Sequence, residues 1–425
     1  MTILIKNGRY INPATETDEK LDVYVSDGKI LKVEKGIKAE ADRVIDAKGC
    51  YVFPGFIDLH VHLRDPGFPD KATVESEVKA AARGGYTTVF AMPNTKPVVD
   101  NGDVVSYVHN KANALDSITV YQIGAITKGQ AGKELADFES MIEAGCPALS
   151  EDGKSVMNTG LYYRAMQKAA ELNIPIFAHC EDKDLVLGGV IHEGKVSKKL
   201  GLPGILSTVE NSITARDLML AGDTGCQLHL CHCSTKESYD LLNDAKKKGF
   251  KVSGEVTPHH FTLIDEDIKT PDPKFKMNPP VRAAEDREVL RKGIADGTFV
   301  ISTDHAPHTE YEKKGSILKA PFGIVGMETA AALANTVLVE GGYMDPMAMA
   351  KAMSFGPAAI AHLETGDISE GKCADITIFN PKKSWVISDE AFVGKNKNQP
   401  YNGMKVKGDV KYTIAKGKVV YENDK

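Results

Sequence analysis

The chain has 425 residues, of which 42% are hydrophobic and 26% charged, a composition typical of a globular protein too long for one small core. Its net charge of −6 offers no basic surface for a nucleic acid, and no apolar run approaches the roughly 18 residues of a membrane span. Seven scattered cysteines form no disulfide framework, which favours a reducing compartment. The sequence thus predicts a soluble cytoplasmic protein that binds neither nucleic acid nor membrane.

The two ends of the chain are rich in short alternating runs typical of β-strands. Asp27-Gly28 separates two such runs and indicates a hairpin. Neither end has enough strands for a stable sheet with its own core, so we predict one composite β-sandwich domain built from residues 1–53 and 366–425. Its expected strands are residues 3–6, 21–26, 30–34, 43–46, 51–53, 374–379, 385–387, 410–415 and 419–421.

The middle of the chain, residues 54–365, alternates between apolar runs and segments with apolar positions at three- and four-residue spacing. Eight strand–helix units of this kind predict an α/β fold, a (β/α)8 TIM-like barrel. A doubly wound open sheet is the alternative, but no Gly-x-Gly-x-x-Gly follows a strand. The expected strands are residues 57–63, 87–92, 119–126, 148–150, 174–179, 227–232, 251–256 and 299–303, and the expected helices include 73–83, 161–172, 209–221 and 236–248.

The run Pro-Gly-Phe-Ile-Asp-Leu-His-Val-His-Leu-Arg-Asp-Pro-Gly (54–67) contains the first barrel strand, which ends in His60 and His62. These two side chains point the same way in a strand, because successive residues alternate between faces. Two imidazoles on one side of a strand end can bind a metal ion, and Arg64 follows on the same face. Taken alone, the His-x-His pair is equally compatible with packed or surface histidines.

Polar residues gather at the expected C-terminal ends of all barrel strands except the third. Catalytic groups of a (β/α)8 barrel lie at this end. The chain has 12 histidines, and eight of them fall at these positions or just beyond. Scattered structural histidines would not gather in this way, so the pattern predicts a metal site. The residues are His60, His62, Arg64, Asn94, Asp152, His179, His232, His259, His260, Asp304, His305 and His308.

Four of these histidines and two carboxylates form a donor set that suits Zn²⁺. Six donors exceed what one tetrahedral ion requires, which predicts two metal ions. A metal-held water loses a proton near neutral pH, and we expect Asp304 to take this proton and pass it to a leaving nitrogen. The alternative for Asp304 is an ordinary cap at a strand end. The expected ligands are His60, His62, Asp152, His179, His232 and Asp304.

Strand alternation separates several neighbours from these ligands. A residue adjacent to a ligand, or three positions from it, lies on the opposite face of a strand. We therefore expect His229, Cys231, Cys233 and His305 to point away from the ligands. The sequence leaves open whether His259 and His260 contact substrate, support the ligands or do neither.

The opening run to His62, the flanking small β domain and Asp-His-Ala-Pro-His (304–308) resemble the amidohydrolase superfamily. Within it, the chain resembles the dihydroorotases of the long-chain bacterial type from end to end. The resemblance implies a hydrolase of pyrimidine biosynthesis that reversibly closes N-carbamoyl-L-aspartate into L-dihydroorotate and water. Its motifs are His-Val-His-Leu-Arg-Asp-Pro-Gly (60–67), Met-Pro-Asn-Thr (92–95), Glu-Val-Thr-Pro-His-His (255–260), Met-Asn-Pro-Pro-Val-Arg (277–282) and Ser-Thr-Asp-His-Ala-Pro-His (302–308).

The resemblance also implies a role for each site residue. Zinc would be bound by His60 and His62 at one position and by His179 and His232 at the other, with Asp152 as the bridge and Asp304 as ligand and catalytic acid–base. Many amidohydrolases bridge with a carboxylated lysine, and Lys154 stays an alternative here. Asp152 is a shorter bridge, which implies partial occupancy of the second position. The implied substrate contacts are His62, Arg64, Asn94, Asn278, His308 and the backbone around Phe322-Gly323.

Two other functions are compatible with parts of this pattern. Allantoinase and dihydropyrimidinase are related cyclic-amide hydrolases that need no arginine for an α-carboxylate, so Arg64 and Asn278 favour dihydroorotase. A non-catalytic partner of aspartate transcarbamoylase would have lost metal ligands, whereas every ligand position here is filled. The resemblance further implies a homodimer and leaves association with aspartate transcarbamoylase open. Residues 307–321 are expected to form a loop that closes over substrate, with an ordinary surface insertion as the alternative.

Overall fold

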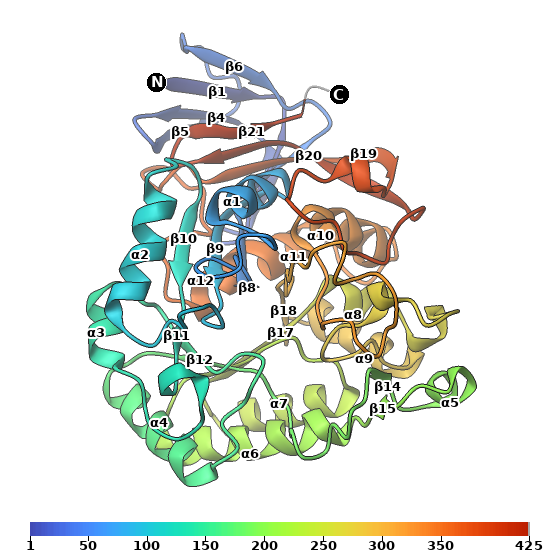
Figure 1. Ribbon diagram of the computed structural model, residues 1–425. Coiled ribbons are helices and arrows are strands. Elements are labelled where there is room, and N and C mark those ends of the chain that lie inside the picture. Colours follow the sequence, from blue (N-terminus) through green and yellow to red (C-terminus); the bar gives the residue numbers. More distant parts are fainter. Residues whose placement is uncertain (424–425) are drawn as a thin grey trace.

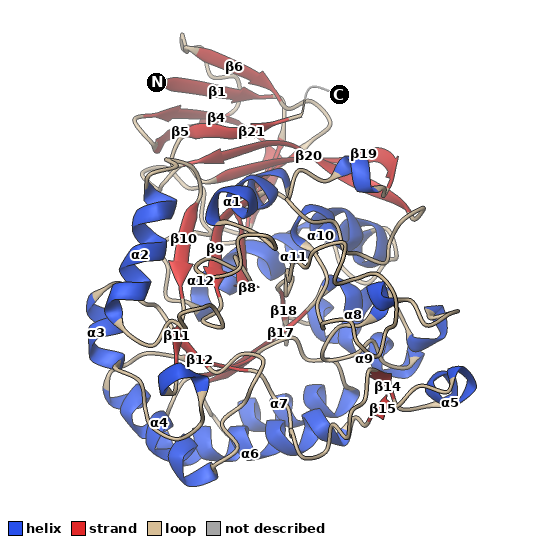
Figure 2. Ribbon diagram, viewed as in Figure 1, coloured by secondary structure: helices blue, strands red, loops and turns tan. Residues whose placement is uncertain are grey.

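The computed structural model describes residues 1–423 and has a mixed α/β fold, with parallel strands in the middle and helices around them (Figure 1; Figure 2). All eight strands expected in the middle of the chain are present, most of them one to three residues shorter than expected. They are β8 (Phe56–Val61), β9 (Tyr86–Ala91), β10 (Thr119–Gln122) with its continuation β11 (Gly124–Ala125), β12 (Leu149–Ser150), β13 (Ile176–Ala178), β16 (Leu228–Leu230), β17 (Val252–Val256) and β18 (Val300–Ile301).

These strands pair in chain order and return to their starting point. Parallel ladders join β8 to β9 and β9 to β10, and a second set runs from β11 through β12, β13, β16 and β17 to β18. Val61 and His305 form a parallel bridge, and the His62 amide donates to the His305 carbonyl at 2.8 Å. These contacts join the first strand to the segment after the last. We call this closed set of strands the strand ring.

Helices cover the outside of the strand ring (Figure 2). The four expected helices are confirmed, and several begin with a side-chain cap: Thr73 accepts from the Ser76 amide and Asn158 from the Leu161 amide. The helices are α1 (Val74–Arg83), α2 (Gly102–Asn113), α3 (Phe138–Glu143), α4 (Thr159–Glu171), α5 (Lys195–Leu200), α6 (Thr208–Thr224), α7 (Lys236–Lys247), α8 (Pro258–Thr262), α9 (Ala284–Ala295), α10 (Met327–Leu333), α11 (Pro346–Ala350) and α12 (Gly356–Ile360).

Strands from both ends of the chain form two further sheets, at the top of Figure 1. One has the order β5-β4-β1-β6 and the other the order β21-β20-β19-β7-β2-β3. An apolar cluster that includes Ile3, Val23 and Ile376 draws on both sheets. The strands are β1 (Thr2–Lys6), β2 (Arg9–Asn12), β3 (Thr17–Lys20), β4 (Asp22–Ser26), β5 (Lys29–Glu34), β6 (Arg43–Asp46), β7 (Tyr51–Pro54), β19 (Ile376–Val386), β20 (Lys405–Ala415) and β21 (Lys418–Glu422).

Apolar side chains fill the inside of the strand ring away from the site. Ile57, Phe90 and Phe177 belong to one buried cluster there. All seven cysteines are free, as expected, and six of them are buried. Burial of apolar surface, rather than disulfide cross-links, therefore stabilises this fold. Within residues 1–423, no helix is both long and apolar enough to span a lipid bilayer.

Candidate metal and substrate site

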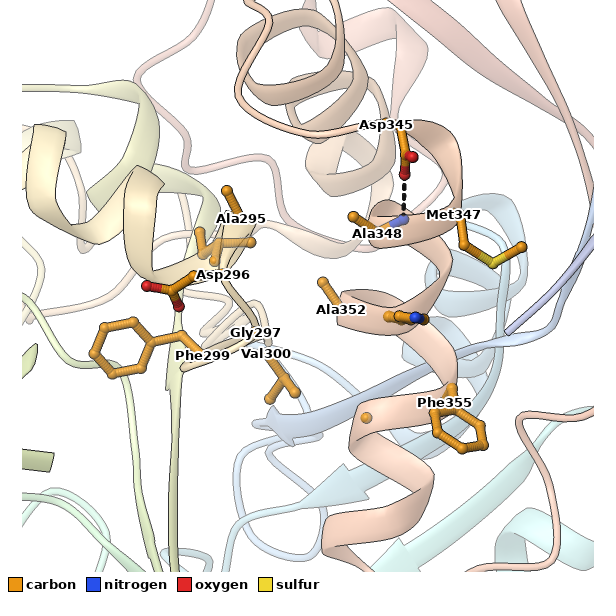
Figure 3. A pocket seen from close by; sticks show the side chains of 13 residues that line it. Ala295, Asp296, Gly297, Phe299, Val300, Asp345, Met347, Ala348, Ala352 and Phe355 are labelled. Atoms are coloured by element: carbon orange, nitrogen blue, oxygen red, sulfur yellow. Dashed lines mark hydrogen bonds between the residues drawn. The ribbon is translucent and has the colours of Figure 1, made fainter. Parts of the chain in front are cut away.

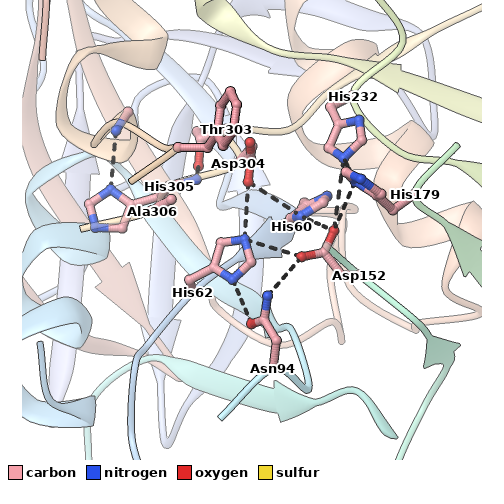
Figure 4. Close-up of polar contacts among 12 residues, drawn as sticks. His60, His62, Asn94, Asp152, His179, His232, Thr303, Asp304, His305 and Ala306 are labelled. Atoms are coloured by element: carbon pink, nitrogen blue, oxygen red, sulfur yellow. Dashed lines mark hydrogen bonds and ion pairs between the residues drawn. The ribbon is translucent and has the colours of Figure 1, made fainter. Parts of the chain in front are cut away.

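Six expected ligands lie together at one end of the strand ring (Figure 4). His60 belongs to β8, and the other five follow directly or closely after the ends of β8, β12, β13, β16 and β18. Because the strands are parallel, their C-terminal ends meet at one side of the ring. All six side chains are buried: His60, His62, Asp152, His179, His232 and Asp304.

The Asp152 carboxylate lies between two pairs of histidines (Figure 4). On one side, its oxygens are 3.3 Å from His60 Nε2 and 3.5 Å from His62 Nε2. On the other, Oδ1 is 3.6 Å from His179 Nδ1 and 3.8 Å from His232 Nε2. A carboxylate in this position can bridge two ions. Lys154, the alternative bridge, is exposed.

Asp304 lies on the side of the first histidine pair. Its Oδ1 is 3.1 Å from His62 Nε2 and 3.4 Å from His60 Nε2. Burial by itself raises the pKa of this carboxyl group, but the His62 hydrogen bond and the charges of the surrounding histidines lower the pKa to about 2. The carboxylate is therefore ionised at neutral pH and can act as a base.

The donor atoms fit a metal-binding role. Among the described residues, His60 Nε2, Asp152 Oδ1 and His232 Nδ1 are buried without a hydrogen-bond partner. Ligand atoms of His60, His62 and Asp304 lie within 4.8 Å of one another, as do those of His60, Asp152 and His232. Buried polar atoms without hydrogen-bond partners destabilise the folded state, and coordination of a metal ion removes this penalty for nitrogen and oxygen donors. The four imidazoles and two carboxylates are ligands that suit zinc.

Neighbouring polar groups orient the ligands. His60 Nδ1 is 2.9 Å from Glu255 Oε1, and His62 Nδ1 is 2.9 Å from Asn94 Oδ1. Partners of this kind fix the tautomer of a metal-binding histidine and leave its other nitrogen free for the ion. The first histidine pair thus presents both Nε2 atoms towards Asp152 and Asp304.

The second histidine pair is arranged differently. His179 Nδ1 and His232 Nε2 are 2.8 Å apart, so one of these nitrogens carries a proton that the other accepts. His179 Nε2 is 3.2 Å from Glu181 Oε2. A metal ion bound by both histidines would replace the shared proton.

Three site residues have left-handed backbone conformations, which are uncommon for non-glycine residues. The φ angles are 60° at Arg64, 35° at His232 and 47° at Asp304. Such strain concentrates at functional sites, where the surrounding structure enforces it. At these positions the backbone leaves the strand, so simple alternation no longer decides where a side chain points.

The expectation that Cys231 points away from the ligands is wrong for this reason. His232 has the left-handed φ, and strand alternation does not hold at such a residue. The Cys231 sulfur lies within 4.8 Å of ligand atoms of His60 and Glu255. Burial is the main cause that raises the pKa of this thiol, to about 12. Cys233 points away as expected, towards the carbonyl of Leu230.

Three of the four remaining histidines discussed for this region have structural partners. His229 is packed as expected, between Ser253 Oγ at 2.8 Å and Glu255 Oε2 at 3.0 Å. His305 points away from the ligands, to Glu77 Oε2 at 2.5 Å. His260 is held by Thr257 and by the Pro279 carbonyl. His259 is buried, and its Nε2 has no hydrogen-bond partner among residues 1–423.

A cavity of about 150 Å³ opens over the ligands. Arg64 lies at its wall, where Nε donates to the Pro307 carbonyl at 3.2 Å and Nη2 is 3.1 Å from His308 Nε2. His308 Nε2 is also 2.7 Å from the Phe322 carbonyl. Ten of the twelve expected site residues line the cavity, while His60 lies beneath it and His308 behind Arg64. The lining ten are His62, Arg64, Asn94, Asp152, His179, His232, Asn278, Asp304, Phe322 and Gly323.

The two asparagines expected to contact substrate already have protein partners. Asn94 Oδ1 is hydrogen-bonded to His62, and its Nδ2 donates to Asp152 Oδ2 at 3.1 Å. Asn278 Nδ2 donates to Glu181 Oε1 at 2.6 Å. Both side chains line the cavity, so each can face a ligand while it orients the metal-binding residues.

The loop formed by residues 307–321 connects Ala306 to Phe322, and these two residues line the cavity. Its buried Lys313 Nζ donates to the carbonyls of Pro273, Lys276 and Pro321 at 3.2, 3.0 and 2.8 Å. Lys71 Nζ is 2.8 Å from Glu312 Oε1. These contacts attach the loop to the segments around it, and closure over substrate stays a prediction.

Sequence reasoning did not identify Glu181 and Glu255 as site residues. Glu181 contacts His179 and Asn278, and Glu255 contacts His60 and His229. A signal existed for Glu255, because a carboxylate within an expected buried strand needs a partner. Glu181 stands two residues after His179, and the sequence gives no comparable signal for it.

A larger cavity, of about 440 Å³, lies between α9 and α11 (Figure 3). The two carboxylates that line this cavity already accept hydrogen bonds from the protein. Asp345 accepts from the Ala348 amide at 2.8 Å, and Asp296 accepts from Tyr239 and from the Thr298 amide. The smaller cavity with its histidines is therefore the candidate site.

Comparisons with known proteins identify relatives of the whole chain. A family model described as dihydro-orotase-like matches residues 49–238. The chain is 46% identical over 425 residues to a dihydroorotase from Pelotomaculum thermopropionicum, covering 100% of this chain and 99% of that protein. It is 45% identical over 423 residues to a dihydroorotase from Bacillus subtilis, covering 99% of each. An L-hydantoinase (dihydropyrimidinase) from Arthrobacter aurescens superposes with a TM-score of 0.89 at 24% identity, covering 100% of this chain and 96% of that one.

These likenesses differ in what they establish. The hydantoinase shares the fold, since its sequence identity is only 24%. The bacterial relatives share 45–46% of their residues over nearly their full length, which includes the strand ring and both terminal sheets. The chain belongs to the dihydroorotase family.

Proposed function

We propose that this protein is a zinc-dependent dihydroorotase, which reversibly closes N-carbamoyl-L-aspartate to L-dihydroorotate and water in pyrimidine (UMP) synthesis. The observation that carries the proposal is the cavity in which Arg64 lies beside the histidine–carboxylate cluster. Full-length relatives with the dihydroorotase name support it. The family makes this a cyclic-amide hydrolase.

The donor set would hold two zinc ions. When bound, zinc polarises a carbonyl group and lowers the pKa of a coordinated water. We propose that the second ion is only partly bound, because the short side chain of Asp152 reaches less far than a carboxylated lysine. The proposed ligands are His60 and His62 for the first ion, His179 and His232 for the second, Asp152 for both and Asp304 for the first.

Asp304 is the proposed catalytic residue. In the hydrolytic direction, a water oxygen adds to the ring carbonyl carbon and the adjacent C–N bond breaks. Asp304 accepts the proton of the water and donates it to the leaving ring nitrogen, so the carboxylate is regenerated. Its pKa of about 2 leaves it ionised at neutral pH and ready for the first proton transfer. Ring closure follows the same path in reverse.

Arg64 is the proposed contact for the substrate's α-carboxylate. A planar guanidinium matches a carboxylate with two parallel hydrogen bonds. This local positive charge contrasts with the overall charge of −6. The neutral ring of dihydrouracil offers no such group, so Arg64 favours dihydroorotate over the substrates of allantoinase or dihydropyrimidinase. The other proposed contacts are His62, Asn94, Asn278, His308, Phe322 and Gly323.

The proposed architecture is a (β/α)8 barrel with a composite β-sandwich. The closed strand ring and its helices support a barrel over residues 54–365. The two sheets built from both termini, with an apolar cluster between them, support a second domain of residues 1–53 and 366–425. In this arrangement the sandwich leaves the C-terminal ends of the barrel strands open to substrate.

We further propose a cytoplasmic homodimer with N-carbamoyl-L-aspartate and dihydroorotate as its small-molecule ligands. The free cysteines are compatible with a reducing compartment. We also propose that the protein associates with aspartate transcarbamoylase. Sedimentation of the protein alone and mixed with the transcarbamoylase tests both assembly proposals.

Steady-state rates on four substrates test the proposed reaction. We expect kcat/KM for dihydroorotate to exceed that for dihydrouracil, hydantoin and allantoin by about 10- to 150-fold, the value of one lost charge-assisted contact of about 1.5–3 kcal/mol. Negligible turnover of dihydroorotate by zinc-loaded protein would contradict the proposal. Absence of both bound zinc and activity after reconstitution would favour the non-catalytic partner.

A further inference from the structure

Glu255 lies in β17, beneath the metal ligands and away from the cavity. Its side chain has no exposed surface. Oε1 is 2.9 Å from His60 Nδ1 and accepts from the His232 amide at 3.2 Å, while Oε2 is 3.0 Å from His229 Nε2. One buried carboxylate therefore contacts a ligand from each histidine pair.

The proton positions in this group follow from its composition. The carboxylate of Glu255 accepts from His229 Nε2, which therefore carries a proton, and a neutral His229 ring then accepts at Nδ1 from the Ser253 hydroxyl. The ionised carboxylate only accepts, so the proton of His60 is on Nδ1. His60 Nε2 faces the space between Asp152 and Asp304, at 3.3 and 3.4 Å, so this is the nitrogen that would bind an ion there.

We propose that Glu255, supported by His229, is a positioning residue that fixes the tautomer and ring orientation of His60 for metal binding. Through the His232 amide it also holds the backbone that carries one ligand of the second pair. This role deepens the proposed zinc-dependent function and rests on it. A carboxylate partner raises the basicity of a metal-binding histidine as well as orienting it.

The charge of Glu255 distinguishes it from the other orienting groups. His62 is oriented by the neutral amide of Asn94. The carboxylate of Glu181 contacts only the second pair and is partly reached by the cavity residue Asn278. Among these orienting groups, Glu255 is the carboxylate that contacts a ligand of each pair, so its replacement tests the orientation of His60 and His232.

Cys231 provides a competing arrangement at the same place. Its sulfur, His60 and Glu255 offer three ligand atoms within 4.8 Å of one another. A metal ion held there would replace the proton between His60 and Glu255, and Glu255 would then be a ligand rather than a positioning residue. The variant Cys231→Ser separates the two arrangements.

The test uses full-length Glu255→Gln, His229→Gln and Cys231→Ser. The substitution Glu255→Gln keeps the size of the side chain and one acceptor oxygen but removes the charge. We expect it to weaken zinc binding about 10- to 100-fold, measured by competition with a chromophoric chelator. His229→Gln should weaken zinc binding less, and Cys231→Ser should leave it unchanged. With saturating zinc, Glu255→Gln should lower kcat and leave KM for dihydroorotate unchanged.

Glu328→Gln is the matched control, because Glu328 is another buried carboxylate and, within residues 1–423, accepts hydrogen bonds from the backbone amides of Val393 and Gly394 alone. Its zinc affinity should equal that of the unaltered protein. The proposal would be overturned if Glu255→Gln had the same zinc affinity and kcat as the unaltered protein. It would also be overturned if the substitution lowered only the melting temperature of the metal-free protein. Equal weakening in Cys231→Ser would also overturn it. Zinc binding without dihydroorotate turnover in the unaltered protein would refute the proposed function, while the zinc affinities would still decide the role of Glu255.

Discussion

The two histidine pairs of the site differ in how their rings are held. In the first pair each Nδ1 has its own partner at 2.9 Å, Glu255 for His60 and Asn94 for His62. In the second pair His179 and His232 contact each other at 2.8 Å. Within residues 1–423, His232 Nδ1 has no hydrogen-bond partner.

The difference bears on how each pair binds a metal ion. The first pair is arranged for coordination before the ion arrives, because both tautomers are set by outside groups. In the second pair the proton between His179 Nδ1 and His232 Nε2 must first move away, to His232 Nδ1 or to solvent, so an ion there competes with this hydrogen bond and with protonation. We therefore expect the first position to bind zinc more tightly than the second.

The largest expected effect comes from Asp304, which lies on the side of the first pair. Asp304→Asn keeps the shape but cannot accept the proton of the attacking water, so kcat should fall by about 10²- to 10⁴-fold. Zinc content should stay as in the unaltered protein, since the amide oxygen remains a donor and five other ligands are intact. Turnover at the original rate, with metal content confirmed by elemental analysis, would exclude Asp304 as the base.

A smaller effect is expected at Arg64, on the same side of the cavity. Arg64→Ala removes a charge-assisted contact worth about 1.5–3 kcal/mol, which corresponds to an increase in KM for dihydroorotate of about 10- to 150-fold. Arg64→Lys should give an intermediate KM, because it keeps the charge but not the planar fork. If KM were unchanged in both variants, the substrate's carboxylate would have to lie elsewhere.

Metal removal compares the two pairs directly. During dialysis against increasing chelator, zinc should leave in two steps, and the first ion lost should be the one held by His179 and His232. Raising the pH should shift that first step to higher chelator concentration, because deprotonation frees the nitrogen shared by this pair. Zinc per chain and activity are measured together. A single step for both ions, independent of pH, would contradict the comparison.

Much of the fold could be predicted, because period-two apolar runs and polar strand ends are visible in a sequence. All eight expected ring strands exist, and their C-terminal ends bring the six expected metal ligands to one side. The hairpin of β2 and β3 was not predicted. The β3 segment Thr17–Lys20 is polar and mostly exposed, so it lacks the apolar alternation that identifies a strand.

What sequence reasoning missed depends on backbone geometry and on distant contacts. The Cys231 sulfur lies near His60 next to the left-handed φ of His232, and residue type does not signal such a conformation. The role of Glu255 depends on three strands that bring His60, His229 and the His232 amide around one carboxylate. Pairings between segments so far apart along the chain cannot be read from local patterns.

The smallest expected effect concerns the pKa of a buried carboxylate, which depends on whether imidazole rings donate hydrogen bonds to it. Burial raises the pKa of Glu255, but hydrogen bonds from His229 and His60 outweigh it and hold that pKa below its ordinary value. Burial also raises the pKa of Glu328, to about 7, and its hydrogen bonds come only from backbone amides. Glu328 thus shows how burial raises the pKa of a carboxyl group that lacks imidazole donors.

Glu328 should make the stability of the protein depend on pH. Its folded pKa is above its unfolded value, so the folded state binds more protons between about pH 4.5 and 7 and the free energy of unfolding falls as pH rises through that range. The full loss is on the order of 3 kcal/mol above pH 7. Glu328→Gln does not titrate and should flatten this dependence in urea unfolding of the metal-free protein, whereas the exposed Glu364→Gln should not. Identical pH profiles for Glu328→Gln and the unaltered protein would show that Glu328 is ionised at little cost, and that backbone donors can replace imidazoles around a buried carboxylate.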